Sequence, residues 1–330
     1  MIKLLEIIKK ASSILLTLHT SPDGDSVGAN LAMYRFLKNL NKEVTLIAGD
    51  SQIPLNYKHL PGIENVLERN IFQIDLDEYD LFIALDIAGV DQISKLGSIE
   101  FPKNLTILNI DHHIRNQLFG TTNYIVADAP ATCEIIYNLF KSWSASRRTK
   151  IDHDTAANLI VGIYDDSLFK YHNTTYKTFE IAAKLAKICP EFNDYLFDID
   201  NSNSPEKIKF MGVALSHIEN YFNDEVAISA VPFELMEKNR FPLGTTDDTD
   251  INNILKSVVG WNIGINFFEY QPDKIKLGFR TRDEKKYDVS LIAKELGGGG
   301  HKAASGATIN MPFDVAKELL LKKLKSIYNL

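Results

Sequence analysis

Short apolar runs alternate with amphipathic segments over the first part of the chain. Four apolar runs have the length and character of strands buried on both faces: Ile14–Leu18, Val44–Ala48, Leu81–Leu85 and Thr106–Ile110. Apolar residues recur at helical spacing over about Val27–Leu40, Thr132–Lys141, Asp154–Tyr164 and Thr175–Ile188. Strands that alternate with helices predict an α/β fold with a mainly parallel sheet. Ser26, just before the first of these helices, is the N-cap candidate.

The pattern changes between residues 190 and 205. Pro190 ends a helical segment, and 201–205 is polar and turn-rich. We therefore place a domain boundary there, with a first domain at 1–190, a linker at 191–204 and a second domain at 205–330. The last part is predicted to contain helices near 206–220, 288–296 and 312–329, and strands at 226–231, 263–270 and 274–281. This mixed order predicts a smaller α+β domain.

Composition and charge narrow the class of protein. The 330 residues are 45% hydrophobic and 24% charged, which is typical of a globular chain of one large or two medium domains. The net charge is −7, whereas a protein that holds long nucleic acid on a basic surface is usually positive. Either the substrate is not a polyanion, or bound metal and a local basic patch attract it.

Cysteine usage and apolar run lengths indicate a cytoplasmic setting. Cys133 and Cys189 form no CxxC pair, so a zinc–thiolate site is not supported. No apolar run approaches the ~20 residues of a membrane span, and the N-terminal segment lacks the features of a signal peptide. We expect no membrane partner.

Histidines and aspartates follow the predicted strands and one helix. They form four groups: His19, Asp23 and Asp25; Asp86; Asp111, His112 and His113; Asp165 and Asp166. Each group alone could be a helix cap, a turn or a solvated surface. In a parallel sheet, however, ligands bind beyond the carboxyl ends of the strands. Mixed imidazole and carboxylate donors at one rim predict a two-metal site that suits Mn²⁺, with Mg²⁺ or Co²⁺ as alternatives.

Two features of the last 60 residues point to anion binding. Gly297–Gly300, followed by His301 and Lys302, offers backbone N–H groups and two side-chain donors, although a flexible hinge is the alternative. Arg280 and Arg282 are two residues apart on a predicted strand, so they would share a face and suit a phosphate. A solvated strand face is the other interpretation.

These motifs together resemble the DHH phosphoesterases. The resemblance rests on His19-x3-Asp23-x-Asp25, Asp86, Asp111-His112-His113 and the segment from Gly162 to Phe169, in consistent order. The last segment departs from the family pattern Gly-x-x-x-Asp-Thr-Gly-x-Phe by being one residue short. Counting from Gly162 favours Asp166 as the metal ligand and leaves Asp165 as the alternative.

The resemblance implies a role for each matching position. His19, Asp23 and Asp86 would bind one Mn²⁺. Asp25, Asp86, His112 and Asp166 would bind a second ion, with Asp86 as the bridge. The resemblance also implies that Asp111 and His113 act in catalysis. Asp111 would hold an imidazole in place, and His113 would face the phosphate or leaving group.

The C-terminal part resembles the first subtype of DHH-associated domain, whose signature is Gly-Gly-Gly-Gly-His. Gly298, Gly299, Gly300, His301, Lys302, Arg280 and Arg282 would then bind substrate in a cleft between the domains. The chain resembles the compact two-domain nanoRNase/pAp phosphatases, which implies short single-stranded RNA, dinucleotides or 3′-phosphoadenosine 5′-phosphate (pAp) as substrates. Manganese-dependent pyrophosphatase and a non-catalytic nucleotide sensor are the alternatives. Related proteins often pair, so a homodimer is considered.

Overall fold

The computed structural model describes residues 2–147, 150–170, 173–246 and 249–330 and divides into two compact units. The first unit spans Met1–Ser202 and the second Asn203–Leu330. Most of the segment assigned from sequence to a linker, 191–204, is a helix, α6 (Phe192–Asn201). Partly buried apolar side chains of α6 pack on the core of the first unit, so the segment is structured.

The first unit is built on a six-stranded sheet in which every paired neighbour is parallel, as the sequence predicts. Its order is β3-β2-β1-β4-β5-β6. The strands are β1 (Ser13–Thr17), β2 (Glu43–Ile47), β3 (Val66–Leu67), β4 (Leu81–Leu85), β5 (Thr106–Asp111) and β6 (Thr122–Ile125). The helices are α1 (Ile2–Lys10), α2 (Gly24–Asn39), α3 (Thr132–Arg147), α4 (His153–Ser167), α5 (Tyr176–Ile188) and α6.

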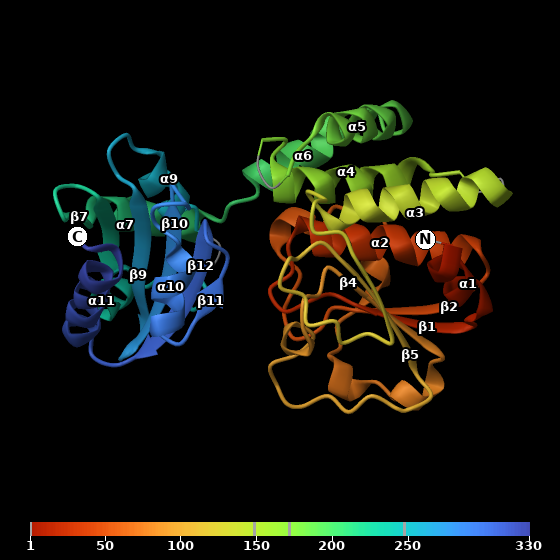
Figure 1. Cartoon of the computed structure of the whole chain (residues 1–330), viewed down its shortest axis with the longest axis horizontal. Helices are drawn as coiled ribbons and strands as arrows, with labels where there is room; N and C mark the ends of the chain where they lie inside the picture. The colour runs from red at the N-terminus through yellow and green to blue at the C-terminus, as the bar shows by residue number, and fades with distance from the viewer. Residues whose placement is uncertain (1, 148–149, 171–172, 247–248) are drawn as a thin grey trace. The chain divides into compact units, whose positions relative to one another are not determined.

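Alternate side chains of the strands enter two different cores. Ile14 and Leu16 pack with the helices, and α2, α3 and α4 lie together on one side of the sheet (Figure 1). Leu15 and Phe82 point to the opposite face, where apolar side chains from 71–101, a segment with three short 3₁₀ turns, cover them. This burial on both faces explains why the strands are unbroken apolar runs.

The second unit has a mixed six-stranded sheet of order β11-β12-β10-β9-β8-β7, in agreement with the predicted α+β class. The β8–β9 pair is parallel and the other pairs are antiparallel. Its strands are β7 (Ile218–Tyr221), β8 (Val226–Val231), β9 (Ile263–Gln271), β10 (Lys274–Thr281), β11 (Gly299–Gly300) and β12 (Ala304–Asn310). Its helices are α7 (Pro205–Ser216), α8 (Phe233–Asn239), α9 (Ile251–Ser257), α10 (Val289–Glu295) and α11 (Phe313–Tyr328).

Among the element boundaries that differ from the sequence prediction, two bear on the site and the second sheet. The helix expected to reach Asn220 ends at Ser216, because β7 begins at Ile218 and pairs with β8. The N-cap of α2 is Asp23 rather than Ser26: the Asp23 side chain accepts a hydrogen bond from the Ser26 backbone N–H at 3.0 Å. Among the described residues, no helix is long and apolar enough to span a bilayer.

Candidate metal centre

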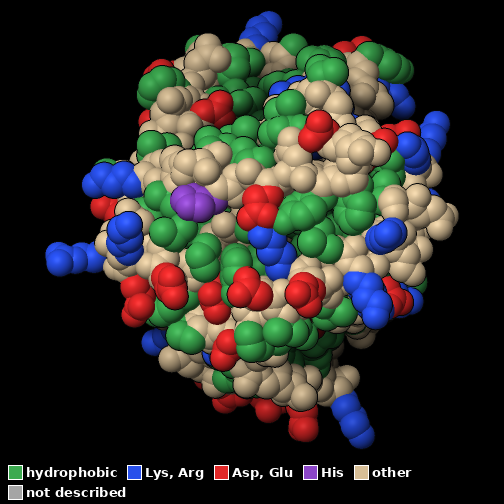
Figure 2. Space-filling model, turned by 90° about the vertical axis from the view of Figure 1, so that its left-hand side faces the viewer, with side chains coloured by type: hydrophobic (Ala, Val, Ile, Leu, Met, Phe, Trp, Pro, Cys, Tyr) green, Lys and Arg blue, Asp and Glu red, His purple; other side chains and the backbone are tan. Residues whose placement is uncertain are grey.

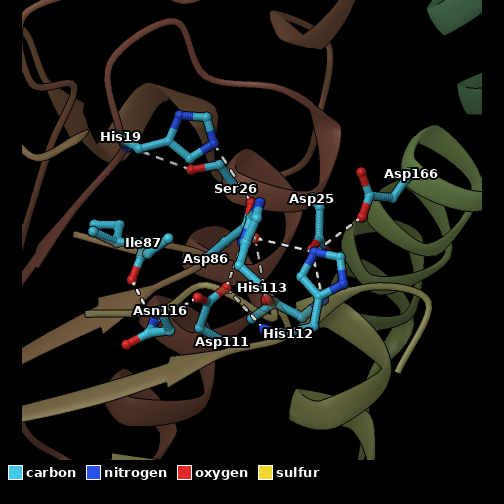
Figure 3. A network of polar contacts seen from close by, with 12 residues as sticks. His19, Asp25, Ser26, Asp86, Ile87, Asp111, His112, His113, Asn116 and Asp166 are labelled. Atoms are coloured by element: carbon cyan, nitrogen blue, oxygen red, sulfur yellow. Dashed lines mark hydrogen bonds and ion pairs between the residues drawn. The ribbon is translucent and has the colours of Figure 1, made fainter. Parts of the chain in front are cut away.

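The predicted histidines and aspartates of the first unit converge at the carboxyl edge of its parallel sheet. β1, β4 and β5 end beside one another, and His19, Asp86 and Asp111 lie at or just beyond those ends. Figure 3 shows these side chains facing one another, with Asp25 from α2 and Asp166 from α4 completing the group. Neighbouring parallel strands therefore bring together residues that lie about 90 positions apart.

Asp86 lies at the centre of the group, and its two carboxylate oxygens face different histidines. Oδ2 is 3.5 Å from Nε2 of His19, and Oδ1 is 3.6 Å from Nε2 of His112. The Thr132 hydroxyl donates to Oδ1 at 3.2 Å. Asp86 is 2% exposed and has a φ of 59°, a left-handed conformation that L-residues seldom adopt. Strain of this kind persists where the surrounding fold fixes a side chain's direction.

Two sets of donors share the neighbourhood of Asp86. His19, Asp23 and Asp86 can each place a ligand atom within 4.8 Å of the others. The same holds for Asp25, His112 and Asp166, and the shorter contact in that set is 3.2 Å between His112 Nε2 and Asp166 Oδ2. The two sets correspond to the ligand groups implied by the resemblance, although the role of each residue as a metal ligand stays a prediction.

Asp25 is oriented by the N-terminus of α3. Its oxygens accept the backbone N–H groups of Thr132 at 2.5 Å and Cys133 at 2.8 Å. These N–H groups belong to the first turn of the helix, where they have no intrahelical partner and where the helix dipole favours an anion. The carboxylate is fully buried, so these bonds fix its direction and leave lone pairs for another ligand.

The two adjacent aspartates near the end of α4 have different surroundings. Asp166 faces His112, as described above. Asp165 Oδ2 instead accepts the Gly24 N–H at 2.8 Å and the Tyr57 hydroxyl at 3.1 Å. Asp165 therefore joins α4 to the start of α2, while Asp166 lies among the candidate ligands. This geometry favours the assignment of Asp166 made from the sequence.

His113 is held by a buried aspartate. Its Nδ1 is 2.7 Å from Asp111 Oδ1, which also accepts the His112 backbone N–H at 2.8 Å. The other oxygen of Asp111 accepts the Asn116 amide at 2.6 Å. The Asp111 contact fixes the orientation of the His113 ring. Burial alone would lower the pKa of His113, but the hydrogen bond with Asp111 and the charge of Asp86 raise it to about 9.

The carboxylates of the centre repel one another. Burial raises the pKa of Asp25 well above its usual value, and the charges of Asp86 and Asp23 raise it further. Burial and the charges of Asp25 and Asp23 act on Asp166 in the same direction. Burial also favours a higher pKa for Asp86, but His19, His113 and His112 outweigh it and lower the value.

Such crowding of buried carboxylates is unfavourable unless a cation neutralises it. The donors present are two imidazoles and four carboxylates, the ligand types that suit divalent first-row metals such as Mn²⁺. The residues of the centre therefore fit a pair of divalent ions.

The predicted arginines of the second unit have unequal surroundings. Arg280 lies on β10, and burial lowers the pKa of its guanidinium. Arg282 follows the end of the strand, and its Nη1 donates to the carbonyl oxygens of Lys256, Ser257 and Val258 at 2.7–3.2 Å. Arg282 thus satisfies carbonyls at the end of α9. The role of Arg282 as a phosphate ligand stays a prediction, and its Nη1 group already donates hydrogen bonds within the protein.

The glycine segment is ordered into a helix end and a short strand. Gly297 has a φ of 79°, and the Gly298 N–H bonds back to Ala293 O at 2.7 Å, which ends α10. A Cβ on Gly298 would lie 2.0 Å from Gly306 O, so glycine permits this close approach. Gly299 and Gly300 pair with β12, and His301 and Lys302 follow as exposed residues. Anion binding by this segment stays untested.

Several residues that support the centre were not predicted. Asn116 and Tyr57 hold Asp111 and Asp165, and Thr132 contacts both Asp25 and Asp86. One sequence signal was available: Asn109 interrupts an apolar strand. It is fully buried, and its Oδ1 accepts from Asn116 at 2.8 Å. A buried amide needs partners, so it marks a polar network near the end of that strand.

Comparison with known protein families agrees with the fold and the motifs. A model described as the DHH family, N-terminal domain, matches residues 13–163, and a DHHA1 domain model matches residues 240–329. The chain thus contains a DHH domain followed by a DHHA1 domain. As a DHH protein with a DHHA1 domain, it is a metal-dependent phosphoesterase.

Curated relatives of this DHH protein extend over nearly its whole length. A Thermus thermophilus protein named bifunctional oligoribonuclease and PAP phosphatase NrnA is 26% identical over 327 residues, covering 97% of this chain and 92% of the relative. A Mycoplasma genitalium protein of the same name is 26% identical, with 98% and 96% covered. The Bacillus subtilis protein of that name is 23% identical, with 93% and 92% covered.

Solved structures show the same fold. A crystal structure of an exopolyphosphatase-related protein from Bacteroides fragilis has a TM-score of 0.88 at 22% identity and covers 99% of this chain and 96% of its own. A crystal structure of the exonuclease RecJ bound to manganese has a TM-score of 0.54 at 15% identity, with 99% and 93% covered. At these identities the likeness concerns the fold alone.

Proposed function

We propose that this DHH protein is a Mn²⁺-dependent phosphohydrolase for very short nucleotide substrates. It degrades short single-stranded RNA and linear dinucleotides such as pApA to nucleoside monophosphates, and it releases inorganic phosphate from pAp. The observation that carries the proposal is the position of Asp86, whose two oxygens face two separate donor sets. The shared name of the three relatives supports the choice of substrates.

The chain's own residues divide the work of binding and proton transfer. His19, Asp23 and Asp86 would hold one ion, and Asp25, Asp86, His112 and Asp166 the other. Two such ions would supply an activated water and would stabilise charge on the phosphate. His113, with Nδ1 held against Asp111, presents Nε2 to donate a proton to the leaving oxygen. Because the orientation of the His113 ring is already fixed, less conformational entropy is lost when it donates the proton.

The second unit would bind the phosphate and terminal nucleotide through Arg280, His301, Lys302 and the adjacent glycines. A short substrate agrees with the charge distribution. On the face drawn in Figure 2, which looks onto the C-terminal unit, Lys and Arg side chains are interspersed with Asp and Glu. Long duplex binding depends on many phosphate contacts along a continuous basic track, and that face has none.

One assay tests the substrate class. Purified protein with Mn²⁺ is incubated with pAp, pApA, a pentameric RNA, a cyclic dinucleotide and pyrophosphate. We expect turnover of pApA and pAp. Pyrophosphate hydrolysis far faster than pApA hydrolysis would identify a pyrophosphatase, and tight nucleotide binding without turnover would identify a sensor.

Asp86→Ala tests the shared ligand. The variant should lose hydrolysis while its circular dichroism stays unchanged, because one carboxylate serves both donor sets. Asp77→Ala, an exposed aspartate in a 3₁₀ turn, is the matched control and should keep full activity. Retained activity in Asp86→Ala would remove the bridging role.

A further inference from the structure

A second group of metal-ligating side chains lies in the first unit, at the other end of α4. His153 is the first residue of α4, Cys189 follows the last residue of α5, and Glu191 precedes α6. Thirteen residues of α4 separate His153 from Asp166, which at 1.5 Å per residue is about 20 Å. The group is therefore distinct from the candidate metal centre.

The three donors are close together and chemically different. The imidazole, thiol and carboxylate each place a ligand atom within 4.8 Å of the others. His153 Nε2 is 2.5 Å from Glu191 Oε1, and Nδ1 is 2.9 Å from Asp154 Oδ1. Arg35 in turn holds Asp154 through an ion pair of 2.9 Å. A histidine whose Nδ1–H is given to a carboxylate presents a free Nε2 lone pair, the usual arrangement of a metal-binding imidazole.

The chain between the two other donors is a rigid turn. Pro190 lies between Cys189 and Glu191, and its ring fixes φ, which lowers the entropy lost on binding. The Cys189 thiol is fully buried and free of any disulfide. Its backbone N–H bonds to Leu185 O at 2.9 Å, which anchors the turn to α5. Glu191 and His153 are partly exposed, so an ion can approach these two donors from solvent.

The charges around the group favour a cation. Burial raises the pKa of Cys189 to about 11, and the charges of Glu191, Asp154 and Asp194 contribute to this. With Nδ1–H donated to Asp154, the 2.5 Å contact between His153 Nε2 and Glu191 Oε1 is a hydrogen bond that shares a proton, and a bound ion would take the place of that proton.

We propose that His153, Cys189 and Glu191 bind one thiophilic divalent cation of the Zn²⁺ class, which ties the start of α4 to the turn between α5 and α6. One nitrogen, one thiolate and one carboxylate are ligands that zinc accepts at about 2.0–2.3 Å, and water completes the coordination. The exposed Glu191 side chain opens slightly to admit the ion. The sequence contains no CxxC pair and therefore did not indicate a zinc–thiolate site. A site with a single thiolate, however, does not require two cysteines at that spacing.

Cobalt spectroscopy tests the proposal in the full chain. The reduced Asp86→Asn protein, in which the shared ligand of the candidate metal centre is altered, is titrated with Co²⁺ alone and then with Zn²⁺. We expect a near-ultraviolet thiolate-to-cobalt charge-transfer band that Zn²⁺ removes. Cys189→Ser in this background should abolish the band, and Cys133→Ser, the matched buried cysteine, should retain it.

His153→Ala is the second variant, chosen because its side chain is partly exposed and its loss should not impair folding. It should raise the Kd for Co²⁺ about tenfold or more. Absence of the band before mutation would overturn the proposal and leave His153 as a protonated imidazole between two carboxylates. A band that survives Cys189→Ser would also overturn it.

Discussion

Close packing between α2 and α4 leads to a prediction that links stability to activity. Gly28 of α2 lies against the backbone of α4, and a Cβ added there would be 2.4 Å from Asn158 O. Carbon–oxygen contacts normally lie at about 3.3–3.6 Å. Gly28→Ala must therefore part the two helices by roughly 1 Å, because a backbone carbonyl cannot rotate away as a side chain can.

The packing cost expected for Gly28→Ala exceeds the gain in helix propensity that alanine brings. Alanine is favoured over glycine in a helix by up to about 1 kcal/mol. Forcing extra volume into a packed interface typically costs about 1–3 kcal/mol, and more where backbone opposes it. We expect Gly28→Ala to lower the free energy of unfolding by about 1–3 kcal/mol overall. Because α2 carries Asp25 and α4 carries Asp166, a shift of this size should lower kcat/KM by up to about 100-fold.

Urea unfolding and pApA hydrolysis at saturating Mn²⁺ measure the two effects. Gly212→Ala is the control: Gly212 is exposed in the interior of α7, and no atom lies within 4 Å of the added Cβ. It should stabilise the protein by about 0.5–1 kcal/mol and leave hydrolysis unchanged. A Gly28→Ala protein with the stability and activity of the unsubstituted chain would refute the argument from helix spacing.

Three further substitutions test individual parts of the site. Asp166→Asn should reduce hydrolysis far more than Asp165→Asn, because the two hydrogen bonds that Asp165 accepts can also be accepted by an amide oxygen. Equal losses of activity in a steady-state assay would count against Asp166 as the ligand. Leu168→Gly should raise the free energy of urea unfolding by about 1 kcal/mol, because Leu168 has a φ of 44° at the end of α4, and a decrease would contradict this. His301→Ala should raise the KM for pApA more than it lowers kcat, whereas a defect in kcat alone would argue against substrate binding.

The sheet of the first unit could be predicted because burial on both faces leaves a clear signal. Leu81–Leu85 is unbroken and apolar, and the structure has the same bounds. In the second unit, β12 was missed because its first four residues, Ala304–Ala307, are small and have a low preference for strands. Its pairing with β10 comes from tertiary contacts, and Gly278 opposite Gly306 is invisible to a propensity argument.

The convergence of the candidate ligands followed from topology, but their orientation did not. Asp86 and Asp111 lie at the ends of adjacent strands, so their proximity follows from a parallel sheet. The direction of the Asp25 carboxylate, by contrast, depends on two N–H groups of α3 that lie 107 and 108 residues away. Contacts of this kind arise only when the helix packs, and no local pattern encodes them.

The segment from Gly162 to Phe169 departs from the family pattern, yet it still places Asp166 among the candidate metal ligands. The family pattern has a glycine two residues after the aspartate, whereas here Leu168 takes that place, and Leu168 and Phe169 both adopt positive φ values of 44° and 53°. The buried Ser167 hydroxyl accepts the Phe169 N–H at 3.1 Å and bonds to the helix at Ile163 O, which fixes the turn without glycine. The backbone strain thus lies just beyond Asp166, whose position on the last turn of α4 is unaffected. Relief of this strain by Leu168→Gly should therefore increase stability without displacing the Asp166 carboxylate. The variant thus separates the backbone conformation at Leu168 from metal binding by Asp166.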